Sequence, residues 1–431
     1  MDELVDELAR LVAIPSVSAP GFPAEEVRRS AETVAERFAD AGAAETRLLE
    51  APDMHPAVYA AFPGPPEAPT VLLYAHHDVQ PPGPLEAWET PPFRATIRGG
   101  RIHGRGTADD KNGIVTHLGV VRAFGGHPPV TVKVLVEGEE EIGSPNLGRL
   151  LDDHGDLLAA DVVVVADSAN WRRGVPALTT SLRGLVDCLV EVRTLRAGIH
   201  SGLFGGPVPD ALTVLVRLLA SLHDEHGDVT VPGLVAGDAD PLDLDEDELR
   251  AQAGTVAGLR LLGEGALTAR LWRRPAASIL AVDAPRTDEA INQLVPVARA
   301  KVSLRLAPGD DPDRAMESLV RHLEAATPWG AEVTVTPGAR GRPFEAAPDG
   351  PGHRAFTAAM TAAYGTPPVE IGMGGSIPLV AALEEHLPAA EILLVGAADP
   401  TSNLHGPDES QDLEDLRRAT LAEALALDAL A

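Results

Sequence analysis

Cysteine and lysine are nearly absent from this 431-residue chain. Its one cysteine, Cys188, allows no disulfide within the chain and cannot build a cysteine cage around a metal. Lysine occurs only at positions 111, 133 and 301, so arginine carries nearly all of the positive charge. The formal net charge is -29, from 64 acidic and 35 basic residues. Nucleic acids and anionic membranes both require a positive face, so the composition argues against either as a partner.

Long apolar runs are absent as well. No window of about 18 apolar residues occurs, so we expect no membrane span and no membrane partner. The first residues, Met1-Asp2-Glu3-Leu4, are acidic and lack the basic and apolar regions of a secretion signal. These two absences predict a soluble, cytoplasmic protein. A chain of 431 residues is too long for one ordinary core, and the length predicts two or three domains.

A short acidic stretch follows one of the apolar strands that the sequence predicts. The residues from Val130 to Val136 are mostly β-branched and lead directly into the four glutamates of residues 137–141. Like charges at the end of a buried strand repel one another and are costly to remove from water. A basic cluster or a metal ion would relieve that repulsion. On these residues alone, a solvated acidic turn is an equally good interpretation.

Other acids and histidines also follow predicted strands. His76 and Asp78 come after the strand at residues 71–74, and Asp167 comes after the strand at residues 161–165. Strands that alternate with helices predict a mostly parallel, helix-flanked sheet of the α/β class, whose ligands bind at the carboxyl ends of its strands. Each residue by itself also has a plain structural explanation, such as a strand-end cap or a satisfied histidine.

The segment from Gly104 to Gly113 is rich in glycine and precedes a predicted helix at residues 114–124. It superficially resembles a phosphate-binding loop, but it lacks the four-residue spacer before Gly-Lys-Ser/Thr. The acids Asp109 and Asp110 open the helix, and an N-cap is the ordinary role for an aspartate in that position.

The order of elements changes after Arg183. A strand-helix-strand-helix-strand succession predicts a smaller α+β domain inserted into the first domain. We therefore predict a first domain from two pieces, residues 1–182 and 342–431, with the inserted domain at residues 183–341.

In combination, these motifs resemble the M20 family of dinuclear zinc peptidases and deacylases. The resemblance extends over nearly the whole chain, through residues 74–81, 104–106, 109–111, 137–144, 166–167, 200–206, 374–378 and His405. It is strongest to the cytosolic nonspecific dipeptidase and carnosinase branch, which favours His-Ser-Gly-x-Phe-Gly-Gly and Gly-Gly-Ser-Ile-Pro. The resemblance implies a zinc-peptidase-type catalytic domain, with the inserted domain serving as a lid and as the dimerisation domain of a homodimer.

The resemblance also implies two divalent metal ions, with Zn²⁺ as the first candidate and Mn²⁺ or Co²⁺ as alternatives. One metal would be bound by His76 and Asp167, and the other by Glu141 and His405, while Asp109 bridges the two. Zinc accepts imidazole and carboxylate ligands and leaves positions open for water. Three carboxylates leave two Zn²⁺ ions with a net charge of about +1, which stabilises a bridging hydroxide.

Catalytic roles are implied for two acids beside the metals. Asp78 would hold the second ring nitrogen of His76, as a partner of a metal-binding histidine commonly does. Glu140 would be the general base, which takes a proton from the water and delivers it to the leaving amine. His77 replaces a residue that is Tyr, Leu or Thr in many relatives, and strand alternation predicts that it faces away from the metals.

Substrate contacts are implied for the inserted domain and for a glycine-rich turn. His200 would reach into the partner's active site of a homodimer and stabilise the oxyanion, and a lid-surface histidine is the alternative. Arg305 and the Gly374-Gly375-Ser376 turn would bind a carboxylate of the substrate. A surface charge with no ligand is the alternative for Arg305.

The aspartate at position 167 favours one activity within the family. Aspartate there accompanies dipeptidase and aminopeptidase activity in relatives, whereas glutamate accompanies carboxypeptidase and deacylase activity. The first hypothesis is therefore a dipeptidase for small unblocked peptides. The alternative is an N-acyl-amino-acid or carbamoyl amidohydrolase on the same scaffold. A metal-binding protein without activity is a third possibility, but it would have lost its base, and Glu140 is present.

Overall fold

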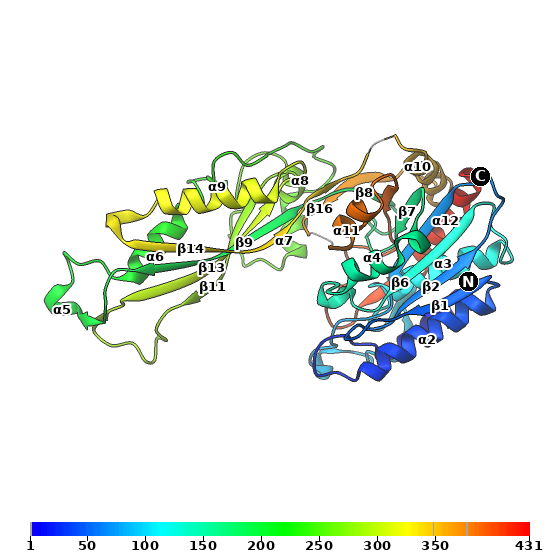
Figure 1. Cartoon of the computed structure of the whole chain (residues 1–431), viewed down its shortest axis with the longest axis horizontal. Helices are drawn as coiled ribbons and strands as arrows, with labels where there is room; N and C mark the ends of the chain where they lie inside the picture. Colours follow the sequence, from blue (N-terminus) through cyan, green and yellow to red (C-terminus); the bar gives the residue numbers. More distant parts are fainter. Residues whose placement is uncertain (1, 348, 376–377) are drawn as a thin grey trace. The chain divides into compact units, whose positions relative to one another are not determined.

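The computed structural model describes residues 2–347, 349–375 and 378–431 (Figure 1). It contains two compact units. Unit 1 consists of Met1–Thr180, Ala346–Ile371 and Pro378–Ala431, and unit 2 consists of Ser181–Glu345 and Gly372–Ile377. The roles predicted for the inserted part, as lid and dimerisation domain, stay predictions. Among the described residues, no helix is both long enough and apolar enough to cross a membrane.

Four parallel strands form the centre of the main sheet. They are, in spatial order, β6 (Thr131–Glu137), β3 (Thr70–His76), β7 (Val162–Val165) and β17 (Glu391–Leu394). Antiparallel pairing extends the sheet through β1 (Glu45–Leu49) and β2 (Ala57–Phe62) at one side and through β8 (Ala177–Leu182) and β15 (Phe344–Glu345) at the other. The strand β16 (Val369–Met373) also pairs with β8. The predicted α/β class with a mostly parallel central sheet is confirmed.

Helices cover this sheet because its central strands are apolar on both faces. All four residues of β7 are buried, as are six of the seven residues of β3, which is typical of parallel strands between two helical layers. The helix α3 packs on β3, α10 packs on β17, and α2 packs on β1 and β2, while α12 contacts both α3 and α10 (Figure 1). The helices of unit 1 are α1 (Asp2–Val12), α2 (Ala24–Asp40), α3 (Lys111–Ala123), α4 (Leu147–Leu158), α10 (Pro351–Tyr364), α11 (Pro378–His386) and α12 (Leu413–Ala429).

A small antiparallel sheet joins two distant parts of unit 1. It consists of β4 (Thr96–Arg98), β5 (Arg101–His103) and β18 (Ser410–Asp412), in the order β18-β5-β4. Ser410 pairs with His103, so the segment before β18 lies beside the segment after β5. Two short 3₁₀ helices, η1 (Leu85–Ala87) and η2 (Glu140–Ile142), complete the unit.

Unit 2 is built on an antiparallel sheet in the order β11-β13-β9-β14. The strands are β11 (Ala276–Asp283), β13 (Val297–Leu306), β9 (Gly184–Arg193) and β14 (Glu332–Gly341). One face of β9 is buried at every second residue, and α6 (Ala211–Ala220) and α9 (Pro312–Ala325) pack against the sheet. The smaller elements are β10 (Ile199–His200), α5 (Ser201–Phe204), α7 (Glu246–Gln252), α8 (Leu267–Trp272), β12 (Gln293–Leu294) and η3 (Pro328–Gly330).

The predicted order of elements for this part of the chain omitted β11 and α7. The last six residues of β11 are exposed, so the strand lacks the alternation of polar and apolar residues that reveals a half-buried strand. The helix α7 lies in an acidic stretch without helical apolar spacing, and its first turn carries three acids behind the N-cap Asp245.

Candidate metal centre

The carboxyl ends of the parallel strands bring several acids and one histidine together in unit 1. His76 is the last residue of β3, and Asp167 follows β7 by two residues. Glu140 and Glu141 begin η2 just after β6. These positions follow from the direction of the strands, because parallel strands present their carboxyl ends at one edge of the sheet.

Asp109 lies between two imidazole rings. Its Oδ1 is 3.0 Å from the Nε2 of His76, and its Oδ2 is 2.9 Å from the Nε2 of His405. Asp110, which follows, is the N-cap of α3 and accepts a hydrogen bond from the main-chain N–H of Gly113. The two aspartates therefore have different roles, since only the first faces both histidines.

Two sets of three side chains offer ligand atoms that lie within 4.8 Å of one another. One set contains His76, Glu140 and Asp167, and the other contains His76, Asp109 and Glu141. The first set includes Glu140, which the resemblance assigns to proton transfer instead of metal binding. In addition, the Nε2 of His405 lies 3.3 Å from the Oε2 of Glu141. The structure thus brings together the five residues predicted as ligands and the predicted base.

The charges of this cluster are not balanced by its histidines. Burial raises the pKa of Asp167 well above its ordinary value, and neighbouring carboxylates add to the shift in spite of His76. Burial likewise raises the pKa of Glu140 to about 7. For Asp109 burial acts in the same direction, but hydrogen bonds with His405 and His76 outweigh it and hold the pKa low. Buried carboxylates beside imidazole nitrogens form a donor set that suits divalent ions such as zinc, so the residues fit a pair of such ions.

Asp78 contacts both the histidine and the glutamates of this cluster. The Nδ1 of His76 lies 3.0 Å from the main-chain oxygen of Asp78 and 3.3 Å from its Oδ1. The carboxylate also accepts hydrogen bonds from the main-chain N–H groups of Glu140 at 3.2 Å and Glu141 at 3.0 Å, and from the hydroxyl of Ser18 at 2.7 Å. Asp78 therefore orients the ring of His76 and holds the glutamate turn at the same time.

The remaining glutamates of the acidic stretch face other partners. The hydroxyl of Tyr74 donates to Glu137 at 2.8 Å, and burial raises the pKa of Glu137 to about 7. Glu139 accepts a hydrogen bond from the main-chain N–H of His55 at 2.8 Å. The adjacent ring of His77 is 2.8 Å from the main-chain oxygen of Pro56 and lies outside both ligand sets.

Sequence reasoning missed three residues that contact the cluster. Gln80 binds Glu141 through both its main-chain N–H, at 3.1 Å, and its side-chain amide, at 2.8 Å. Arg105 donates to the main-chain oxygen of His405 at 3.0 Å. Glu409 accepts a hydrogen bond from the main-chain N–H of Asp109 at 3.1 Å. Gln80 and Arg105 lie within the motifs that carry the resemblance, whereas no pattern in the sequence indicates Glu409.

The residues predicted to contact substrate belong to unit 2. His200 ends β10, is exposed, and its Nδ1 accepts a hydrogen bond from the main-chain N–H of Gly202 at 3.0 Å. Arg305 lies in β13, where its neighbours across the strands are Ala276 and Leu185.

The glycine-rich turn is described only in part. Gly374 approaches Arg183 so closely that a Cβ at this position would lie 2.9 Å from the Nη2 of the arginine. Gly375 follows it, and Ser376 lies outside the described residues.

The comparison with known proteins now identifies the family. The sequence model of peptidase family M20/M25/M40 matches residues 72–428. The chain belongs to peptidase family M20/M25/M40. The resemblance inferred from the motifs is thereby confirmed, and this M20 peptidase is a hydrolase that acts on peptide bonds.

Curated relatives and solved structures of this M20 peptidase include several dipeptidases. It is 36% identical over 367 residues to the cysteinylglycine-S-conjugate dipeptidase of Corynebacterium striatum, covering 83% of this chain and 80% of that protein. It is 29% identical over 432 residues to the human Beta-Ala-His dipeptidase, covering 92% and 84%. Its fold matches the solved di-peptidase Dug1p of Saccharomyces cerevisiae with a TM-score of 0.78 at 25% identity, covering 100% and 96%. Human carnosine dipeptidase 1 matches with a TM-score of 0.77 at 26% identity, again covering 100% and 96%.

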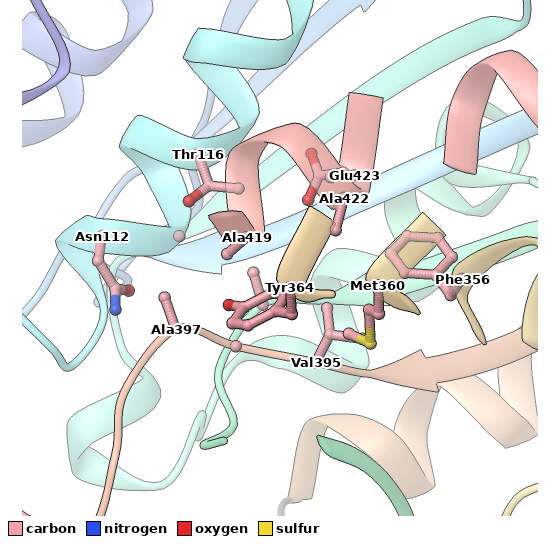
Figure 2. A pocket seen from close by; sticks show the side chains of 13 residues that line it. Asn112, Thr116, Phe356, Met360, Tyr364, Val395, Ala397, Ala419, Ala422 and Glu423 are labelled. Carbon is pink, nitrogen blue, oxygen red and sulfur yellow. The ribbon is translucent and has the colours of Figure 1, made fainter. Parts of the chain in front are cut away.

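A separate cavity of the M20 peptidase lies in unit 1 among α3, α10, α12 and the segment after β17 (Figure 2). Apolar and polar side chains both line it. The apolar ones include Phe356, Met360 and Val395, and the polar ones include Asn112, Thr116 and Glu423. None of the predicted ligands lines it. The cavity volume open to the centre of a water molecule is about 20 Å³, which is enough for one ordered water. Such a water would satisfy the buried Oδ1 of Asn112, which has no partner among the described residues.

Proposed function

We propose that the chain is a metal-dependent dipeptidase that hydrolyses the amide bond of small peptides with a free α-amino group. The position of Asp109 carries the proposal, because its two oxygens face two different imidazoles at 3.0 and 2.9 Å. A carboxylate in that position can bridge two metal ions. The dipeptidase names of relatives at 36% and 29% identity support the same activity.

The residues around Asp109 divide into two sets of metal ligands. His76 and Asp167 would hold one divalent ion, Glu141 and His405 would hold the other, and Asp109 would contact both. Zn²⁺ is the first candidate, and Mn²⁺ or Co²⁺ accept the same donors. The bound ions would supply an activated water and polarise the carbonyl of the scissile bond.

Glu140 is the proposed general base. Its main-chain N–H is held by Asp78 at 3.2 Å, and its carboxylate lies 4.0 Å from the Nε2 of His76 and is partly exposed. A carboxylate beside the ligands but not needed to bind a metal is free to accept a proton from the attacking water. Glu140 then delivers that proton to the nitrogen of the leaving amine, which departs as a neutral group.

The carboxylate of the substrate would be bound in unit 2. Arg305 and the main-chain N–H groups of the turn at residues 374–376 are the proposed donors. Arg183 strengthens this proposal, because burial and, next, the charge of Arg305 lower its pKa to about 10. Two guanidinium groups that repel each other favour an anion between them.

His200 is proposed to stabilise the oxyanion of the reaction, acting on the active site of the other protomer in a homodimer. Because its Nδ1 accepts a hydrogen bond from Gly202, the proton of the neutral ring is on Nε2. That nitrogen can therefore donate to an oxyanion. Dimerisation through unit 2 and a cytoplasmic location are proposed with it.

A substrate panel tests the function. Unblocked dipeptides, the corresponding N-acetyl amino acids and N-carbamoyl amino acids are assayed side by side with the metal-loaded enzyme. We expect turnover of the dipeptides, with the acylated compounds slower by at least tenfold. If only the acylated or carbamoylated compounds are hydrolysed, the dipeptidase assignment is wrong and the amidohydrolase alternative replaces it.

A further inference from the structure

The main-chain N–H groups of the loop between β5 and α3 converge on the carboxylate of Glu409. The Oε1 of Glu409 accepts hydrogen bonds from Ala108 at 2.8 Å and from Asp109 at 3.1 Å. Its Oε2 accepts a hydrogen bond from Gly106 at 3.0 Å. Glu409 is fully buried, so these bonds are protected from water.

Glycine at position 106 makes this arrangement possible. Gly106 has a φ of +82°, which residues with a side chain rarely adopt. A Cβ at this position would lie 2.6 Å from the Cγ1 of Val79. The resulting loop presents three N–H groups, those of residues 106, 108 and 109, to one anion, much as a phosphate-binding loop does. In this chain the anion is supplied internally, by Glu409, which explains why the glycine-rich segment superficially resembles such a loop.

Arg105 forms a buried ion pair with Glu409 and also contacts His405. Its Nη1 lies 2.7 Å from the Oε2 of Glu409, and its Nη2 donates to the main-chain oxygen of His405 at 3.0 Å. His405 has a φ of +59°, which is unfavourable for a residue with a side chain. The hydrogen bond from Arg105 helps to hold the main chain of His405 in this uncommon conformation.

The pair thus contacts the main chain of two proposed metal ligands, Asp109 through Glu409 and His405 through Arg105. Removing two charges from water is costly, and a buried ion pair often contributes little net stability. The hydrogen bonds of this pair reach the main chain at Asp109 and at His405, so the pair can orient these two residues. We propose that Glu409 and Arg105 are positioning residues that fix Asp109 and His405 in the arrangement needed to bind the metals. The inference rests on the proposed function, since Asp109 and His405 are metal ligands only there.

The variant Glu409→Gln tests the inference, because it removes the negative charge and turns an NH₂ group toward main-chain N–H donors. We expect the affinity for Zn²⁺, measured by chelator competition with metal-free protein, to fall about 10- to 100-fold. The visible absorption spectrum of the Co²⁺-loaded protein should also change, since it reports the arrangement of the ligands. Glu391→Gln is the matched control. Glu391 accepts hydrogen bonds from the main-chain N–H groups of Gly352 and His353 at 2.7 Å each, away from the ligands.

A second variant, Arg105→Lys, keeps the charge but loses the planar group that reaches both Glu409 and His405. We expect Arg105→Lys to weaken Zn²⁺ binding about tenfold. If Glu409→Gln does not fold, Arg105→Lys alone tests the positioning role. Wild-type metal affinity and an unchanged Co²⁺ spectrum in the folded variants would overturn the inference, as would an equal loss in Glu391→Gln. Asp109→Asn separates the two proposals: if it binds Zn²⁺ like the wild type, the proposed function itself fails.

Discussion

The main-chain N–H of Glu141 donates a hydrogen bond to the Oδ2 of Asp78 at 3.0 Å. Glu140 donates to the other carboxylate oxygen of Asp78, which is also close to the ring of His76. One buried carboxylate after β3 therefore holds the turn after β6 in place. A negative charge is suited to this position because its partners are an imidazole and two N–H groups.

Replacing Asp78 with asparagine should weaken metal binding. The amide keeps one acceptor oxygen but turns an NH₂ group toward an N–H donor, so the glutamate turn and the ring of His76 both lose support. We expect a 10- to 100-fold fall in Zn²⁺ affinity by chelator competition, roughly as for other partners of metal-binding histidines. Ser18→Ala removes only one bond to Asp78 and should cost less. Equal affinity in Asp78→Asn and the wild type would contradict the orienting role.

Glu140→Gln should abolish most of the turnover without changing the number of metals bound. A positioned general base contributes about 10²- to 10⁴-fold to the rate, and glutamine cannot accept the proton. The neighbouring variant Glu139→Gln is the control, since Glu139 binds the main chain of His55 and not the cluster. Turnover is measured with a dipeptide substrate, and the metal content of the same samples is measured by atomic emission. If the two variants lose activity equally, Glu140 is not the base.

Arg305→Met should raise KM for dipeptides with a free carboxylate. A hydrogen bond to a charged group contributes about 1.5–3 kcal/mol, which corresponds to roughly 10- to 100-fold in kcat/KM. Dipeptide amides should lose much less, because they lack the charge. Arg299 lies on the same strand as Arg305 and pairs with Glu191 of β9, so Arg299→Met should leave both substrate classes unaffected. Equal losses for acids and amides would exclude carboxylate binding by Arg305.

His117 should make the stability of unit 1 depend on pH. Its Nδ1 lies 2.8 Å from Glu423 and its Nε2 lies 3.0 Å from the main-chain oxygen of Tyr74, so both nitrogens face acceptors and the ring is suited to carry two protons. Burial lowers the pKa of His117, but the charge and hydrogen bond of Glu423 outweigh burial and raise the pKa overall. The stabilisation is therefore complete below the unfolded pKa of about 6.5 and is lost as the pH rises through the folded pKa.

The variant His117→Asn tests this dependence by calorimetry. Breaking a buried pair costs about 3–5 kcal/mol, so the difference in unfolding free energy between wild type and variant should be largest near pH 6 and smaller at pH 9. His226→Asn, on an exposed histidine, should give no such difference. A difference that grows with pH would reverse the expected sign and reject the argument.

Cys188 should report the unfolding of unit 2. It is fully buried in the core of that unit, and burial, followed by the charge of Asp187, raises the pKa of its thiol to about 11. Only the thiolate reacts, so native protein at pH 8 should be labelled by a disulfide reagent at least about 100-fold more slowly than protein in denaturant. Rapid labelling of the native protein would show that the strand opens to solvent.

Local patterns in the sequence determined the regular elements and the residue types of the site. Apolar segments predicted strands at residues 71–74 and 161–165 and a helix at residues 114–124. The structure shows β3 (Thr70–His76), β7 (Val162–Val165) and α3 (Lys111–Ala123) at these places. Such apolar segments are local in the sequence, and burial on both faces imposes them directly. The exposed strand β11 has no such pattern, because its partner β13 supplies hydrogen bonds that require no particular side chain. The order of the motifs, from residue 74 to His405, indicated the family that the match over residues 72–428 confirmed.

Only the tertiary structure decided which residues hold the site in place. Glu409 lies 300 residues from Asp109 in the chain, and the pairing of β18 with β5 brings the two together. At Ala108 and Asp109 its partners are main-chain N–H groups, which every residue except proline possesses, so these two contacts do not depend on the residue types at those positions. The partners of the acidic stretch at residues 137–141 were likewise decided by the tertiary structure. Its four glutamates are alike in sequence, and their separate partners, Tyr74, His55, Asp78 and Gln80, follow from the positions of neighbouring strands and loops.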